Sequence, residues 1–219
     1  LDMGIIALNL LGIKMPKKYN RLFYFKELLL SKYLLYKKNI KSITELPVTD
    51  DKHTLAIARI LISCNQPSYV GDPKYFPIIA IKQLNFHLTK GNSIYSSHAY
   101  AIYSLVLSSM GDMTKGYEFG NLSLELFEKF RFRLLKCKIF FIFGTMVNHW
   151  KNHLIEDIYY LKEAYNSGHL TGDLVWAYNS IIHMIMHSFF MGDSLHTIIS
   201  TYDSYYSPIK NFNQSRVIE

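Results

Sequence analysis

Four histidines are the residues of this chain whose types and spacing could bind a metal ion. His149 and His153 lie four positions apart, and His183 and His187 repeat that spacing. Residues at positions i and i+4 share one face of a helix, and helical zinc sites use this arrangement. Two such helices facing each other could supply four ligands, so an unrecognised metal-dependent enzyme is one hypothesis that these residues raise.

The interval between the two histidine pairs has a second explanation. The pairs are 34 residues apart, which matches the length of a helix-pair repeat. Equivalent positions of successive repeats would then carry histidine without binding anything. Trp150, Met184 and Met186 are neighbours that suit packing better than a hydrated metal site. We therefore expect no metal and no cofactor.

Other catalytic chemistry has little support in the sequence. Cys64 and Cys137 form no Cys-x-x-Cys motif and adjoin no histidine, so we expect both to be reduced and buried. No P-loop, kinase glycine-rich loop or Gly-x-Ser-x-Gly motif occurs. Glu156 and Asp157 lie at an expected helix start that looks exposed, where carboxylates complement the helix dipole. We expect the chain to be non-catalytic.

The composition indicates one folded domain. The chain has 219 residues, 49% of them hydrophobic, and only 6 Pro and 11 Gly, with no linker-like segment. We expect residues 1–219 to form a single helical-repeat domain and a fragment of a larger chain, because the first residues read as the end of a helix. No signal peptide is visible, so we expect a cytoplasmic protein.

The charge of the chain is unevenly distributed. Residues 1–50 hold nine Lys and Arg against four Asp and Glu, whereas residues 151–219 hold four against seven. The segment KKYNRLFYFK at 17–26 interleaves cations with aromatic residues, so nucleic-acid binding by the basic N-terminal third is an alternative function. The same pattern arises when an amphipathic helix places Phe and Leu inward and Lys outward, and we favour that interpretation. We expect protein partners.

Hydrophobic periodicity is helical throughout, and no segment alternates as a half-buried strand does. Residues 174–192 carry no formal charge over nearly the length of a membrane span. Asn179, His183 and His187 interrupt that segment, so we expect a fully buried helix and no membrane span. The expected helices cover residues 17–38, a segment capped by Asp50 or Asp51 with a Leu55, Ala58 and Ile62 stripe, 72–88, 93–109, a segment with a Phe119, Leu122, Leu126 and Phe130 stripe, 134–150, 154–165 and 173–190.

Several residues refine these expected helices. Pro67 and a Gly71-Asp72-Pro73 turn should close the second helix, and Ser167 with Gly168 should stop the helix at 154–165. Gly116 and Gly120 should allow a neighbouring backbone to approach closely. The helix at 134–150 is apolar nearly all round, so we expect it inside the stack.

A repeated helix end indicates the architecture. SSMGD at 108–112 and FFMGD at 189–193 are 81 residues apart, which accommodates two units of about 40 residues. Helix hairpins of this length stack on their neighbours into a superhelix. The sequence therefore predicts an all-α fold, an α-solenoid of nine or ten helices in stacked hairpins.

A series of segments also resembles a known family. These segments are ALNLLGIKMP at 7–16, ITELPVTDD at 43–51, KGNSIYSSHAYAIYSLVL at 90–107, GDMTKGYEFGNLSLELFEKF at 111–130, HW at 149–150 and GDLVWAY at 172–178. In this order they resemble the tetratricopeptide-like helical region of large multidomain signalling kinases. In that family a Ser/Thr kinase-like domain and a predicted AAA-type ATPase precede the helical region, and GAF and histidine-kinase domains often follow it. The resemblance implies a regulatory scaffold that contacts proteins or neighbouring domains.

Stacked hairpins place their inner helices along a concave groove. If the helices at 93–109 and 173–190 are inner ones, some of their aromatic residues could anchor a partner, since large rings give contact area at low entropic cost. The alternative is that these residues fill the core. The candidates are Tyr95, Tyr100, Tyr103, Trp176 and Tyr178.

Overall fold

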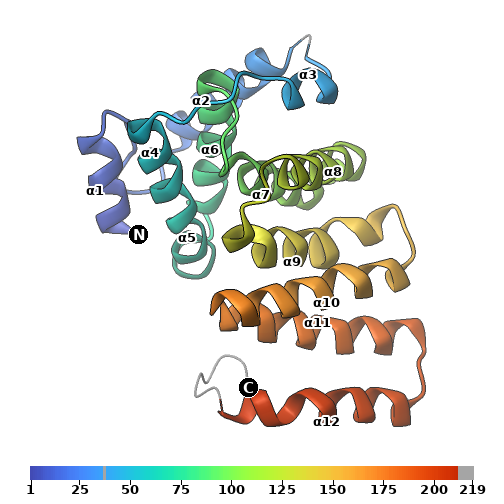
Figure 1. The fold of residues 1–219 in the computed structure, drawn as a ribbon. Coiled ribbons are helices and arrows are strands. Elements are labelled where there is room, and N and C mark those ends of the chain that lie inside the picture. The colour runs from blue at the N-terminus through green and yellow to red at the C-terminus, as the bar shows by residue number, and fades with distance from the viewer. Residues whose placement is uncertain (37, 212–219) are drawn as a thin grey trace.

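The computed structural model describes residues 1–36 and 38–211, with side chains to Tyr205, and its regular structure is helical (Figure 1). Within the described residues the only β pairing is one isolated bridge between Val48 and Asn92. The predicted all-α class is therefore confirmed. No described helix combines the length and hydrophobicity that a membrane crossing requires.

The α-helices follow one another with short connections, and two of the connections contain a 3₁₀ turn. Their bounds are α1 Asp2–Leu10, α2 Arg21–Leu35, α3 Ile40–Thr44, α4 Lys52–Ser63, α5 Asn65–Gly71, α6 Phe76–Lys90, α7 Ser96–Ser109, α8 Met113–Phe130, η1 Arg133–Leu135, α9 Lys136–Met146, η2 Asn148–Trp150, α10 Leu154–Thr171, α11 Leu174–Met191 and α12 Leu195–Asn211.

Local signals explain several helix ends. The Asp51 side chain accepts a hydrogen bond from the backbone N–H of Thr54 and caps α4, as the sequence predicted. Asp112 caps α8 in the same way. Gly111 and Gly192 follow α7 and α11 at φ values of 91° and 81°, a left-handed conformation that glycine adopts without strain.

Helix α4 ends before Pro67 and a turn follows Gly71, as expected, but the expectation that no helix lies between them is wrong. Residues Asn65–Gly71 form the additional helix α5, and Pro67 lies in its first turn, where a missing backbone N–H costs no intrahelical hydrogen bond. The next helix begins at Phe76, later than the predicted start at Asp72 and Pro73. Its first turn contains a proline as well.

The predicted helix stop at Ser167 and Gly168 is also wrong. Helix α10 continues to Thr171, and Gly172 ends it at a φ of 76°. A Cβ atom on Gly168 would lie 2.8 Å from the Cβ of Ala177, so this glycine allows close contact between α10 and α11. The glycine therefore serves helix packing.

Other boundaries and faces differ from the expected ones. The expected helix over 134–150 is reduced to α9, with 3₁₀ turns at both ends, although α9 is buried as predicted. The buried face of α4 includes Ile57 and Leu61, and Leu55 and Ile62 are only partly buried. Helix α11 is not fully buried, because its last turns expose Phe189 and Phe190.

Figure 1 shows α7 to α12 as a stack of roughly parallel rows, with α1 to α6 beside its upper end. In this stack α7 packs on α8, α9 on α10, and α10 on α11, while α9 also contacts α7 and α11. Gly120 of α8 lies against the ring of Phe143 of α9, where a Cβ atom would approach to 2.8 Å. Both cysteines are buried and unpaired, as predicted.

Candidate functional site

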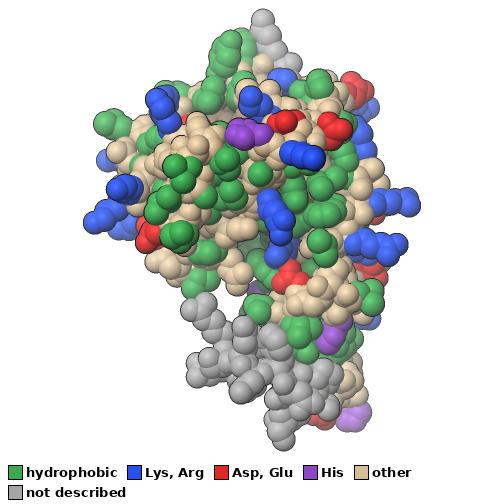
Figure 2. All heavy atoms as spheres, turned by 60° about the vertical axis from the view of Figure 1, so that its left-hand side comes forward, with side chains coloured by type: hydrophobic (Ala, Val, Ile, Leu, Met, Phe, Trp, Pro, Cys, Tyr) green, Lys and Arg blue, Asp and Glu red, His purple; other side chains and the backbone are tan. Residues whose placement is uncertain are grey.

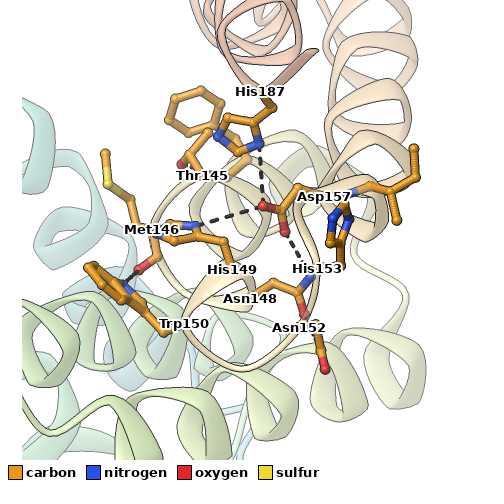
Figure 3. Close-up of polar contacts among 11 residues, drawn as sticks. Thr145, Met146, Asn148, His149, Trp150, Asn152, His153, Asp157 and His187 are labelled. Atoms are coloured by element: carbon orange, nitrogen blue, oxygen red, sulfur yellow. Dashed lines mark hydrogen bonds and ion pairs between the residues drawn. The ribbon is translucent and has the colours of Figure 1, made fainter. Parts of the chain in front are cut away.

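Asp157 is the centre of a buried polar cluster at the junction of α9, α10 and α11 (Figure 3). Its side chain is fully buried, and its Oδ1 accepts a hydrogen bond of 2.7 Å from Asn148 Nδ2. Its Oδ2 lies 3.3 Å from His187 Nδ1 and 3.8 Å from His149 Nδ1. We call Asn148, His149, Asp157 and His187 the Asp157 cluster.

A second amide extends the Asp157 cluster toward α8. Asn152 Nδ2 donates to Asn148 Oδ1 at 2.8 Å and to the Tyr117 hydroxyl at 3.0 Å. Buried polar groups of this kind are stable only when they have hydrogen-bond or charge partners. The hydrogen bonds of Asn148 and Asn152 therefore connect α10, through η2, with α8.

Glu156 and Asp157 lie in the first turn of α10 as expected, but the expected exposure of Asp157 is wrong. Glu156 is exposed, but Asp157 faces inward, one position further along the same helix turn. Burial lowers the pKa of His149, Asp157 opposes this shift, and His187 lowers the pKa further. Thr145, the hydroxyl residue beside the cluster in Figure 3, donates to the carbonyl of Phe141 at 2.6 Å. The cluster therefore has the geometry of a structural network rather than of a nucleophilic site.

The structure does not bring the four histidines of the metal hypothesis together. His149 and His187 both approach Asp157, although they belong to different sequence pairs. His153 caps α10, where its Nδ1 accepts from the N–H of Ile155. The ring of His183 packs edge-on against Phe141, with centroids 5.3 Å apart. Among the described residues, no three His, Cys, Asp or Glu side chains are grouped as metal ligands would be.

A pocket of about 360 Å³ lies between α4, α5 and α6 on one side and α7, α9 and α11 on the other. Figure 2 shows a hollow between the N-terminal helices and the C-terminal stack on the face that it brings forward. We call this cavity the central pocket. Its walls include Tyr69, Phe76, His98, Phe141, Trp176 and His183.

The central pocket combines aromatic walls with few polar groups. Phe141 makes edge contacts with Trp176 and His183 at centroid distances of 5.1 and 5.3 Å. On the other side Tyr69 and Phe76 form a second edge contact at 5.2 Å. Lining of this kind, mostly apolar with a small number of polar groups, is typical of sites for small molecules.

The predicted aromatic anchors divide into two groups. Tyr100, Tyr103 and Tyr178 are buried, at 0%, 7% and 4% exposure, which favours the alternative that they are core residues. Tyr95 is partly buried with its ring against Phe132, and Trp176 is partly buried in the wall of the central pocket. Partner binding by these two residues stays a prediction.

Sequence reasoning missed an apolar surface on α2. Leu22, Phe25, Leu29 and Tyr33 are exposed by 81%, 44%, 65% and 77%. The expectation that Phe and Leu of the segment 17–26 point inward is therefore wrong for Leu22 and Phe25. Their spacing of three, four and four residues places them on one face of the helix. We call these four residues the α2 stripe. The spacing of these residues indicates an apolar face of the helix. It does not show that another face of α2 packs on α6 and leaves this one exposed.

The described residues thus form an all-helical structure with the Asp157 cluster, an aromatic pocket and an exposed apolar stripe. Comparison with curated proteins finds similarity to hybrid signal transduction histidine kinase G of Dictyostelium discoideum, with 24% identity over 153 residues. The match covers 67% of this chain and 4% of that protein. No family model matches the chain. No solved structure matches it either.

This similarity relates the chain distantly to a region of a signalling histidine kinase. The matched protein is many times longer than the part that corresponds to this chain. The similarity therefore concerns a segment of a signalling protein.

Proposed function

We propose that this chain is a non-catalytic, tetratricopeptide-like scaffold segment through which a signalling protein binds another protein or another of its own domains. The packing of α9 against both α7 and α11 supports the superhelical arrangement, because inner helices of successive hairpins contact one another in stacked repeats. The similarity to a segment of a signalling histidine kinase supports the signalling context. The ATPase and kinase activities of the resembling family would belong to other domains.

The observation that carries this proposal is the α2 stripe. Four large apolar or aromatic residues along one helix face remain exposed, with Tyr33 at 77% and Leu22 at 81%. Contiguous apolar surface on a folded domain is characteristic of interaction sites. A stripe with this spacing is the kind of surface on which a second helix packs.

The opposite face of α2 holds the helix in place. Glu27 is buried and accepts hydrogen bonds of 2.8 Å from Lys82 Nζ and 2.9 Å from Asn85 Nδ2, both on α6. Asn85 Nδ2 also donates to the backbone carbonyl of Glu27. These contacts fix the rotation of α2 about its axis. The α2 stripe faces solvent because the opposite face of the helix is held against α6.

The charges beside the stripe indicate the chemistry of the partner. Arg21, Lys26 and Lys32 are exposed on α2, and the one acidic residue of the helix, Glu27, faces inward. A complementary partner is therefore an amphipathic helix with an apolar face and acidic flanks. The basic flanks would accelerate its association at low ionic strength.

A photo-crosslinker placed at position 29 of the full signalling protein tests the proposal. We expect crosslinks to one defined protein segment that contains an acidic amphipathic helix, and we expect the substitution pair Leu22→Glu and Tyr33→Glu, which leaves position 29 to the crosslinker, to abolish them. Leu170→Glu is the matched control, because Leu170 is 88% exposed on α10, away from the stripe. Crosslinks to scattered sites, or equal effects of the pair and the control, would refute the proposal.

The nucleic-acid alternative predicts a different result. Binding to RNA or DNA would weaken steeply with salt and would depend on Lys26 and Lys32 more than on the apolar stripe. Reversing both charges to Glu and titrating a labelled single strand at two salt concentrations separates the alternatives. Tight, salt-dependent nucleic-acid binding lost in this variant would replace the scaffold proposal.

A further inference from the structure

The central pocket has an unexplained polar atom in its wall. His98 of α7 lines the pocket and is 2% exposed, and neither nitrogen of its ring makes a hydrogen bond among the described residues. Such atoms are rare in folded proteins, because a buried polar atom loses its hydrogen bonds to water. A bound molecule could supply the missing hydrogen bond.

The walls of the pocket favour an aromatic molecule. The Phe141 ring, flanked by Trp176 and His183, forms one wall, and Tyr69 with Phe76 lies on the side of α5 and α6. Aromatic rings prefer edge and offset contacts with one another. The volume of about 360 Å³ is at the lower end of the range for small-molecule sites, which suits one or two fused rings.

The electrostatics of the pocket favour a neutral molecule. Lys138 is the one residue with a formal charge among the described residues of the lining, and its ammonium lies 2.9 Å from the Asp173 carboxylate. Burial holds the pKa of His98 at about 3 and that of His183 at about 4, so both rings are neutral near pH 7. A charged ligand would lose its hydration in this pocket and would find no unpaired opposite charge there, so its binding would be unfavourable.

We propose that the central pocket binds a neutral aromatic molecule of one or two rings whose hydroxyl or ring N–H group forms a hydrogen bond with His98. A hydroxyl suits either tautomer of His98, because it can both donate and accept. This inference goes beyond the proposed scaffold function and does not depend on it, since no residue of the α2 stripe lines the pocket. Ligand binding here would connect α5 with α9 and α11, and it would thereby couple the N-terminal helices to the stack.

Three related probes test this proposal by isothermal titration calorimetry at pH 7. 2-Naphthol is neutral with a hydroxyl, naphthalene lacks the hydroxyl, and 2-naphthoate carries a charge. We expect saturable binding of 2-naphthol at one site, roughly tenfold tighter than that of naphthalene because of the hydrogen bond to His98. We expect 2-naphthoate to bind most weakly.

Two variants localise the binding. Val175→Phe fills part of the pocket and should weaken 2-naphthol binding at least roughly tenfold. Val48→Phe makes the same substitution at an exposed position and should change nothing. His98→Leu should remove the preference for 2-naphthol over naphthalene while naphthalene still binds, and if this variant does not fold, the valine pair alone decides the location.

Several results would overturn the inference. No saturable binding of 2-naphthol or naphthalene would show that the cavity is not a site for neutral aromatic molecules. Tighter binding of 2-naphthoate would show that the pocket prefers an acid. Equal affinities of Val175→Phe and Val48→Phe would place the binding elsewhere.

Discussion

Asp157 of α10 places its carboxylate 3.3 Å from the imidazole of His187 on α11, inside the protein. Asn148 and His149 approach the same carboxylate from η2. One buried acid thus joins three consecutive elements of the stack. Its removal would leave Asn148 Nδ2 without its acceptor and the two imidazoles without the carboxylate that they approach.

The first prediction concerns this junction. Asp157→Ala should lower the free energy of unfolding by roughly 1–3 kcal/mol, because Asn148, His149 and His187 lose their common partner. Urea denaturation followed by circular dichroism measures the change. Glu156→Ala is the matched control at an exposed neighbouring position and should cost no more than roughly 1 kcal/mol through the helix dipole. Equal losses in the two variants would contradict a role for the buried carboxylate.

The second prediction concerns pH. Burial lowers the pKa of His98 to about 3 and those of His87 and His183 to about 4, from 6.5 for an exposed histidine. Between pH 6.5 and about 4 the unfolded chain therefore binds protons that the folded chain does not. The free energy of unfolding should keep its full value above pH 6.5. It should decrease as the pH is lowered, by up to ~1.4 kcal/mol per pH unit for each such histidine.

Urea titrations at pH 7 and pH 5 check this dependence. His183→Phe should reduce the difference between the two pH values, whereas His53→Gln, at an exposed position, should leave it unchanged. A chain that is as stable at pH 5 as at pH 7 would refute the prediction.

The third prediction separates core aromatics from surface aromatics. Tyr100 is fully buried against Phe119, so Tyr100→Ala should destabilise the chain by roughly 3–5 kcal/mol through the cavity that it leaves. Tyr33→Ala, at 77% exposure, should change stability by less than about 0.5 kcal/mol. Thermal and chemical denaturation of both variants measure this contrast. A Tyr100→Ala variant with wild-type stability would return Tyr100 to the list of groove anchors.

The fourth prediction concerns the contact between α8 and α9. Gly120→Ala would place a Cβ atom 2.8 Å from the Phe143 ring, so we expect a loss of roughly 1–3 kcal/mol from overpacking. Gly71→Ala is the control, because no atom lies within 4 Å of a Cβ atom there. That control should leave stability unchanged or raise it by up to about 1 kcal/mol. Tolerance of Gly120→Ala without loss would mean that the two helices can separate at little cost.

Features that depend on nearby residues can be predicted from the sequence alone. Helical periodicity established the all-α class, and Asp51 and Gly192 marked helix ends because their interactions span only a few positions. The burial of α9 followed from its composition, since a helix that is apolar nearly all round has no solvated face. The close approach of the α7 backbone at Gly116 was predictable for a similar reason, because only a missing side chain allows it, whereas Gly120 faces the side chains of Phe143 and Val147.

Which side chains face one another depends on how the helices pack, and it could not be predicted from the sequence. The sequence position of Asp157 is that of a carboxylate at a helix start. Its burial depends on His149 and His187, which belong to other elements. Phe25 and Leu29 fit an inward-facing helix, yet α2 turns them outward because Glu27 pairs with Lys82 of α6. Periodicity identifies an apolar face but not the neighbour that covers it, since burial depends on contacts between residues far apart in the chain. The central pocket exists for the same reason, because its walls come from helices that only the folded chain brings together.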